Sequence, residues 1–222
     1  MRVFTPRFTD CTAAPFELGK IVCVGRNYAE HARELGNPVP SEPLIFMKPA
    51  TAACEMEGPL ILPTDLGKVH YETELALLVG RPLRHAEPDE VWPAIVGVGL
   101  ALDLTLRDLQ AQLKEKGHPW EVAKGFDGAC PLSHFLKSNI WPEGRRWRFS
   151  LTVDGELQQH GDTGDMLTPV PELVAYMSRF FTLNPGDVIL TGTPAGVGSL
   201  SPGQSLELTL EEHLTVTTTV AG

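Results

Sequence analysis

The sequence predicts an α+β, β-rich fold, a mixed β-roll or distorted barrel with peripheral helices. Strand-like segments outnumber helical ones, and the two kinds do not alternate as they would in a doubly wound sheet. The segments 206–210 and 214–220 alternate apolar and polar residues, which is typical of half-buried strands. An Asp154-Gly155 pair inside the strand-like segment 149–159 predicts a β-hairpin.

The remaining strands are expected where short apolar runs end at glycine, proline or polar residues. They are expected at 20–25, 44–49, 70–80 and 96–106, and at the start of 186–198, which continues as a glycine-rich loop. Helical patterns are expected at 26–36, 105–117 and 171–181, with a proline-rich loop at 37–43. Thr105 and Asp108 resemble a capping box for the second helix, and Gly117 fits its end.

Composition predicts one globular domain. A chain of 222 residues with 42% hydrophobic content can bury a full core without disulfides or a structural metal. Its formal net charge of −10 argues against nucleic acid or an anionic membrane as the main partner. The chain opens without an apolar stretch of signal-peptide type, and no run approaches the roughly 18 apolar residues of a membrane helix. The four cysteines lack Cys-x-x-Cys spacing, so we expect a cytoplasmic protein with reduced thiols.

The most informative polar pattern is Glu72-Thr73-Glu74, followed at a distance by Asp103. On a strand, Glu72 and Glu74 share a face about 6.5–7 Å apart, where they repel one another unless a cation lies between them. Asp103 ends a strand face made of glycine and alanine, which we expect to leave space for a metal and a substrate. Three carboxylates form an oxygen ligand set that suits Mg²⁺, Mn²⁺ or Ca²⁺ rather than zinc. A solvated edge strand, with Asp103 capping the next helix, is the alternative.

His31 and Glu34 lie three residues apart on a predicted helix and share a face, so the carboxylate can orient the imidazole as a general base. An ordinary surface helix is the alternative. Lys48 and Lys124 sit in apolar surroundings and could anchor a substrate carboxylate or counter the acidic cluster, or they could extend along the surface to water.

Two further segments could contact a ligand. Arg107 and Gln110 share a helix face just beyond Asp103 and could reach a ligand on the metal, or face solvent. The loop TGTPAGVG at 191–198 could surround an anion with backbone N–H groups, although it has neither Walker A nor Rossmann spacing. A plain turn is the alternative for this loop.

Taken in order, VGRNYAEHARELG, EPLIFMKPAT, VHYETELALLVG, ALDLTLRDLQ, PWEVAKGFDGACPLS and LTGTPAGVG closely resemble the fumarylacetoacetate hydrolase family, especially its short acylpyruvase and oxaloacetate decarboxylase-like branch. The resemblance implies a single catalytic domain over 18–222, with 1–17 as an N-terminal extension, and a homodimer. It implies metal ligands at Glu72, Glu74 and Asp103, and a catalytic set of His31, Glu34 and Lys124. Substrate contacts are implied at Arg26, Lys48, Arg107, Gln110 and Thr193.

The resemblance also implies a reaction. We expect an Mg²⁺- or Mn²⁺-dependent hydrolase that cleaves a C–C bond of small 2,4-dioxo acids such as acetylpyruvate or fumarylpyruvate. His31, oriented by Glu34, would take a proton from water, and the metal with Lys124 would stabilise the pyruvate enolate released. The same site could decarboxylate or tautomerise oxaloacetate, or isomerise and decarboxylate 2-oxo diacids from aromatic degradation. A non-catalytic protein that binds a divalent metal or a 2-oxo acid is the alternative from another class.

Overall fold

The computed structural model describes residues 4–36, 38–138, 141–142 and 144–222. In these residues, eight strands form one large mixed sheet, with the order β2-β1-β12-β5-β6-β8-β3 and β9 paired to β6. The strands are β1 (Ile21–Val24), β2 (Ile45–Lys48), β3 (Ala53–Glu55), β5 (Thr73–Val79), β6 (Ile95–Leu102), β8 (Cys130–Leu132), β9 (Leu136–Lys137) and β12 (Val188–Leu190). The pairs β1–β12 and β3–β8 are parallel and the other pairs are antiparallel, so the predicted mixed β-roll is confirmed.

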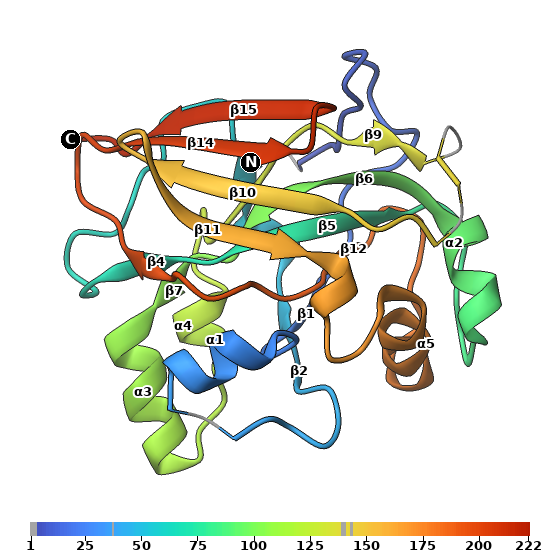
Figure 1. Ribbon diagram of the computed structural model, residues 1–222, viewed down its shortest axis with the longest axis horizontal. Helices are drawn as coiled ribbons and strands as arrows, with labels where there is room; N and C mark the ends of the chain where they lie inside the picture. The colour runs from blue at the N-terminus through green and yellow to red at the C-terminus, as the bar shows by residue number, and fades with distance from the viewer. Residues whose placement is uncertain (1–3, 37, 139–140, 143) are drawn as a thin grey trace.

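Two smaller sheets complete the β-structure. An antiparallel sheet of β11 (Glu156–Asp162), β10 (Arg148–Val153), β14 (Ser205–Leu210) and β15 (Leu214–Thr219) lies across one face of the large sheet (Figure 1). A short sheet joins β13 (Gly198–Ser199), β4 (Val69–Tyr71) and β7 (Thr105–Leu106). The predicted hairpin is present, because Asp154 and Gly155 adopt φ values of 52° and 81°, as a type I′ turn requires.

The helices lie outside the sheets. They are α1 (Ala29–Glu34), α2 (Val91–Ala94), α3 (Arg107–Lys116), α4 (Glu121–Lys124) and α5 (Val170–Phe180), with 3₁₀ turns at Ala50–Ala52, Pro88–Glu90 and Thr163–Asp165. Helices α1, α3 and α4 gather at one end of the molecule, and α2 and α5 lie at the other (Figure 1). No helix in the described residues is long and apolar enough to cross a membrane.

Strand β5 is buried along its whole length because both of its faces meet apolar layers. Leu75 and Leu77 pack with Leu151 and Leu208 of the four-stranded sheet in the larger hydrophobic core. Ala76 and Leu78 point to the opposite face, where a second apolar cluster includes residues from the N-terminal segment, Phe8 and Ala14. A strand covered on both faces is continuously apolar rather than alternating, which explains the run LALLV.

The structure corrects four details of the sequence analysis. The helix expected at 26–36 covers only Ala29–Glu34, and the strand expected at 96–106 ends at Leu102. The strand expected at 70–80 is interrupted at Glu72. The capping box is wrong, since no side chain caps α3 and the Thr105 hydroxyl donates to the Asp103 carbonyl instead. Of the loop expected at 37–43, residue 37 lies outside the described residues.

The glycine face of β6 does not border a cavity, contrary to the prediction. A Cβ atom at Gly97 would lie 2.8 Å from Cβ of Phe135, and one at Gly99 would lie 2.9 Å from Oγ of Ser133. The segment that contains Ser133 and Phe135 therefore packs directly on this face. Glycine is required here so that two backbones can approach closely, and the space for a ligand lies elsewhere.

Candidate functional site

The three predicted carboxylates converge where the large sheet ends. Glu72 occupies the break between β4 and β5, Glu74 is the second residue of β5, and Asp103 follows β6 directly. The backbone N–H of Asp103 donates to the Glu72 carbonyl over 2.8 Å, which holds the two neighbouring strands at the same level. All three side chains are buried.

One carboxylate oxygen from each of Glu72, Glu74 and Asp103 lies within 4.8 Å of the other two. The oxygens around Mg²⁺, at about 2.0–2.1 Å from the ion, are roughly 3–4 Å apart. The Oδ1 atom of Asp103 is buried and lies 2.8 Å from Nζ of Lys48. Buried carboxylates are costly unless cations compensate them. Three buried carboxylates that offer one oxygen each within 4.8 Å of one another form a donor set that fits a hard divalent cation.

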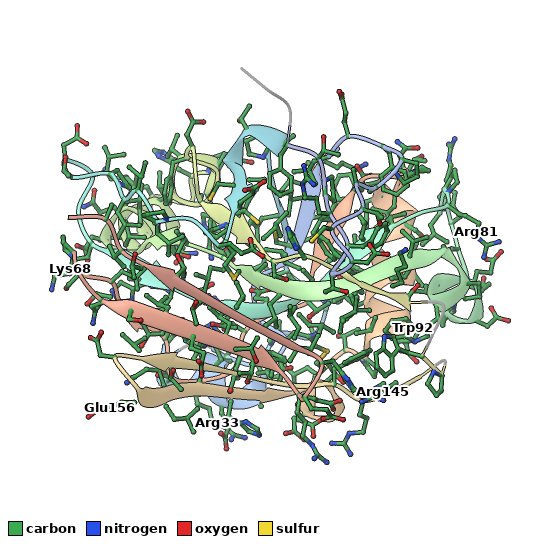
Figure 2. All side chains as sticks on the ribbon, turned by 90° about the horizontal axis from the view of Figure 1, so that it is seen from above. Arg33, Lys68, Arg81, Trp92, Arg145 and Glu156 are labelled. Atoms are coloured by element: carbon green, nitrogen blue, oxygen red, sulfur yellow. The ribbon has the colours of Figure 1, made fainter. Side chains whose placement is uncertain are left out.

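Two buried lysines balance the carboxylates. Lys124 Nζ lies 2.8 Å from Glu72 Oε2 and 2.6 Å from Asp103 Oδ2. Lys48 Nζ lies 2.8 Å from Asp103 Oδ1, but it donates its hydrogen bonds to the carbonyls of Leu104, Lys124 and Ala129. Other charged side chains, such as Lys68, Arg81 and Glu156, project from the edges of the molecule (Figure 2). The burial of Lys48 and Lys124 thus follows from their pairing with the acidic cluster.

The pKa values of Glu72 and Glu74 are shifted in opposite directions. Burial raises the pKa of Glu72, but the positive charges of Lys124 and Arg107 outweigh it, so this pKa falls below its usual range. Burial, with Asp103 and Glu72 nearby, raises the pKa of Glu74 well above its usual range. A cation bound between Glu74 and the two neighbouring carboxylates would offset their repulsion, which agrees with a metal-binding role.

A pocket of about 160 Å³ opens beside the cluster. Among the predicted site residues, its lining includes Arg26, His31, Glu72, Arg107, Gln110 and Lys124. Arg107 forms an ion pair with Glu72, and its Nη1 donates to Gln110 Oε1 over 2.8 Å. The guanidinium and the amide thus orient each other at the rim, and both can contact a small anion.

Of the predicted pair on α1, His31 lines this pocket, whereas Glu34 does not. His31 is buried, and its Nδ1 lies 3.6 Å from Glu34 Oε2, beyond hydrogen-bond distance. Burial is the largest cause that lowers the pKa of His31; Arg107 and Lys124 lower it further, while Glu72 and Glu34 act in the opposite direction. The imidazole is therefore held in its neutral form, which a general base requires.

Backbone N–H groups of the glycine-rich loop donate hydrogen bonds to side-chain carboxylates of the same chain. The N–H of Gly192 donates to Glu74 Oε2, and the N–H of Gly196 donates to both carboxylate oxygens of Glu34 over 3.1 and 3.2 Å. One loop thereby holds a candidate metal ligand from β5 and the acidic member of the pair on α1.

Gly196→Ala is expected to lower the free energy of unfolding by about 1–3 kcal/mol, because φ is +97° there. An added Cβ would also collide with the Gln158 carbonyl, so the loop would shift away from Glu34 and turnover would fall. Denaturant unfolding and initial rates measure both effects. Gly203→Ala is the control, because its φ is also positive, at +85°, but its Cβ would meet no atom within 4 Å. Equal losses of stability and turnover in both variants would contradict a role for the close approach of Gly196 to the Gln158 carbonyl.

Two predicted substrate contacts lie away from the pocket lining. Thr193 is buried, and its hydroxyl donates to the Thr73 carbonyl over 2.9 Å. Lys48 is buried behind the carboxylates with its hydrogen bonds directed at carbonyls. Their contact with substrate stays a prediction. Sequence analysis missed Gln159, which is buried and bonded to Thr73 and Thr193. The polarity pattern of β11 gave little indication of this, because Leu157 is apolar yet exposed on the same strand.

The chain is similar to known proteins along most of its length. Residues 20–221 match the family model described as fumarylacetoacetate (FAA) hydrolase C-terminal. This chain is 50% identical over 199 residues to the oxaloacetate tautomerase YcgM of Escherichia coli, and the alignment covers 89% of this chain and 91% of the relative.

Two solved structures extend the comparison. A fumarylpyruvate hydrolase from Pseudomonas aeruginosa, in complex with Mn²⁺ and pyruvate, superimposes with a TM-score of 0.93 at 33% identity, covering 100% of this chain and 97% of that one. A 5-carboxymethyl-2-hydroxymuconate delta-isomerase from Mycobacterium smegmatis gives a TM-score of 0.81 at 35% identity, covering 99% and 82%. This chain therefore belongs to the fumarylacetoacetate hydrolase family of enzymes.

Proposed function

We propose that this protein is a divalent-metal-dependent enzyme of small 2-oxo acids that interconverts the keto and enol forms of oxaloacetate. The convergence of Glu72, Glu74 and Asp103 beside a pocket lined by Arg107, Gln110 and Lys124 carries the proposal. The similarity to the Escherichia coli tautomerase supports the choice of oxaloacetate.

Mg²⁺ or Mn²⁺ held by Glu72, Glu74 and Asp103 would supply a Lewis acid for the C2 oxygen of a bound 2-oxo acid. Arg107, already directed toward the pocket by Glu72 and Gln110, binds a substrate carboxylate. Neutral His31 takes a proton from C3, and Lys124 stabilises the negative charge that develops on the C2 oxygen. A proton returned to that oxygen completes the enol, and the reverse steps restore the ketone.

Hydrolysis of acylpyruvates is the second candidate, and the His31–Glu34 pair favours it. A base next to a pocket can activate water as readily as it can deprotonate carbon. Water attacks the C4 carbonyl, the C3–C4 bond breaks, and the products are a carboxylic acid and pyruvate. The Pseudomonas aeruginosa fumarylpyruvate hydrolase supports this candidate. We also expect a cytoplasmic homodimer, in keeping with the sequence and its resemblance.

The test is a substrate panel with Mn²⁺, with Mg²⁺ and with EDTA. We expect the purified protein with either metal to accelerate loss of the enol absorbance of oxaloacetate, and EDTA to remove that acceleration. A reaction with metal and no protein is the control, because free divalent ions act on oxaloacetate. Pyruvate release from acetylpyruvate or fumarylpyruvate measures the second candidate. Tight Mn²⁺ binding by calorimetry without any turnover would favour a binding protein instead.

A further inference from the structure

The edge of β5 next to the candidate metal ligands is completed by side chains rather than by a strand. Strand β12 pairs with β5 only from Ala76 to Leu78. Beyond that point the chain turns into the glycine-rich loop, which leaves the peptide groups around Thr73 without a strand partner on that side. Buried backbone groups must be satisfied, and here the partners come from Thr193 and Gln159.

Gln159 reaches this edge from β11 of the four-stranded sheet. Its Oε1 accepts from the N–H of Thr73 over 2.9 Å, and its Nε2 donates to Thr193 Oγ1 over 2.8 Å and to the Pro194 carbonyl over 3.0 Å. The side chain is 1% exposed. A backbone donor on one side and a carbonyl acceptor on the other determine which amide atom is oxygen and which is nitrogen.

The orientation of the Gln159 amide also determines the direction of the hydrogen bond made by the Thr193 hydroxyl. Because its Oγ1 accepts from Gln159, its proton is free to be given to the Thr73 carbonyl, 2.9 Å away. Thr73 therefore has both its N–H and its carbonyl bonded to this pair of side chains. Thr73 is the residue between Glu72 and Glu74, so the two bonds act on the two peptide groups that join it to these glutamates and set the spacing of their carboxylates.

The same loop contacts both the proposed metal ligand Glu74 and the carboxylate of Glu34 on α1. Besides Thr193 and Pro194, it contributes the N–H of Gly192 to Glu74 and the N–H of Gly196 to Glu34. Gln159 is the described side chain that ties this loop to the four-stranded sheet at Thr193 and Pro194. A shift of the loop would move a metal ligand and the pair on α1 together.

We propose that Gln159 is a positioning residue that sets the distance between the carboxylates of Glu72 and Glu74 by bracing Thr73 and the glycine-rich loop. The proposal rests on the proposed metal site but assigns Gln159 no contact with substrate. Both amide atoms of Gln159 and the hydroxyl of Thr193 have partners, so this buried network favours one arrangement, and removal of its central amide leaves several buried groups unpaired.

The test is Gln159→Met, which keeps the length of the side chain but removes both amide groups. Mn²⁺ binding is measured by calorimetry, and kcat and KM are measured for oxaloacetate. We expect the Mn²⁺ dissociation constant to rise about tenfold and kcat to fall about 10–100-fold, while KM changes less than threefold. Gln159→Asn, which retains a shorter amide, is used if the methionine variant does not fold, and an intermediate loss is expected for it.

Ser178→Ala is the matched control. Ser178, on α5, is also 1% exposed, and its hydroxyl accepts from the N–H of Ala86 and donates to the carbonyl of Ala175. It should lower the melting temperature without changing Mn²⁺ affinity. A double variant with Thr193→Val should lose less Mn²⁺ affinity than the two single effects combined, because both residues act on Thr73.

Wild-type Mn²⁺ affinity and kcat in Gln159→Met would overturn the proposal, as would equal losses in Ser178→Ala. Absence of turnover in the wild type would count against the proposed function alone, because Mn²⁺ binding still reports on Gln159.

Discussion

Asp103→Ala is expected to abolish metal binding and to lower the free energy of unfolding by about 3–5 kcal/mol. The carboxylate is one of three candidate ligands, and its neighbours are also two buried ammonium groups. Lys48 lies 2.8 Å from Oδ1 and Lys124 lies 2.6 Å from Oδ2. Without Asp103, Lys48 keeps its three carbonyl partners but loses its counterion, and Lys124 keeps one carboxylate partner among the described residues, Glu72. An uncompensated buried charge is what makes this removal costly.

Calorimetric titration with Mn²⁺ and urea unfolding measure the two effects separately. Asp103→Asn retains the shape and should lose metal binding with a smaller stability change. Asp108→Ala is the control, because Asp108 is an exposed carboxylate in the first turn of α3. Its loss should cost no more than about 1 kcal/mol and leave Mn²⁺ affinity intact. Unchanged Mn²⁺ affinity in both Asp103 variants would contradict the assignment of this carboxylate as a ligand.

His31→Ala is expected to lower kcat for acylpyruvate hydrolysis and for oxaloacetate tautomerisation by about 10²–10⁴-fold. Both reactions need a base, to deprotonate water in one case and C3 in the other. Decarboxylation of oxaloacetate breaks a C–C bond without that proton transfer, so it should fall much less. The Mn²⁺ dissociation constant should stay within about twofold, because the proposed metal ligands are Glu72, Glu74 and Asp103 and not the imidazole.

The measurement is kcat for hydrolysis, tautomerisation and decarboxylation, determined on one preparation of each variant. His118→Ala, at an exposed position just after α3, is the control and should change none of the rates. Glu34→Gln should give a smaller loss than His31→Ala, since Glu34 Oε2 lies 3.6 Å from Nδ1 of His31, too far for a hydrogen bond. Equal losses in all three reactions, or a large loss of Mn²⁺ affinity, would contradict the role of His31 as a base.

Local sequence signals predicted the features that depend on local conformation. The Asp154-Gly155 turn was predictable because these residue types tolerate positive φ, and Gly117 ends α3 with φ at 66° for the same reason. The buried strand β5 was predictable from its apolar run. The charged residues Glu72, Glu74 and Lys124 stood out because their neighbours are apolar, and ionised groups in such places need partners.

Features that depend on distant partners could not be predicted in this way. The expectation of a cavity beside Gly97 and Gly99 failed because Phe135 and Ser133, more than thirty residues away, fill the space. The partners of Lys48 are carbonyls, which have no sequence signature. Gln159 was missed because its partner Thr73 is 86 residues away and its own strand shows no regular apolar alternation.

Residue types and short spacings were enough to predict the β-rich class, the family resemblance and the three carboxylates. The backbone hydrogen bond between Asp103 and Glu72, the burial of both lysines against these carboxylates and the contacts of Gln159 with Thr73 became known from the folded chain. Buried polar groups need hydrogen-bond partners, and here those partners come from distant segments that meet when the separate sheets pack together.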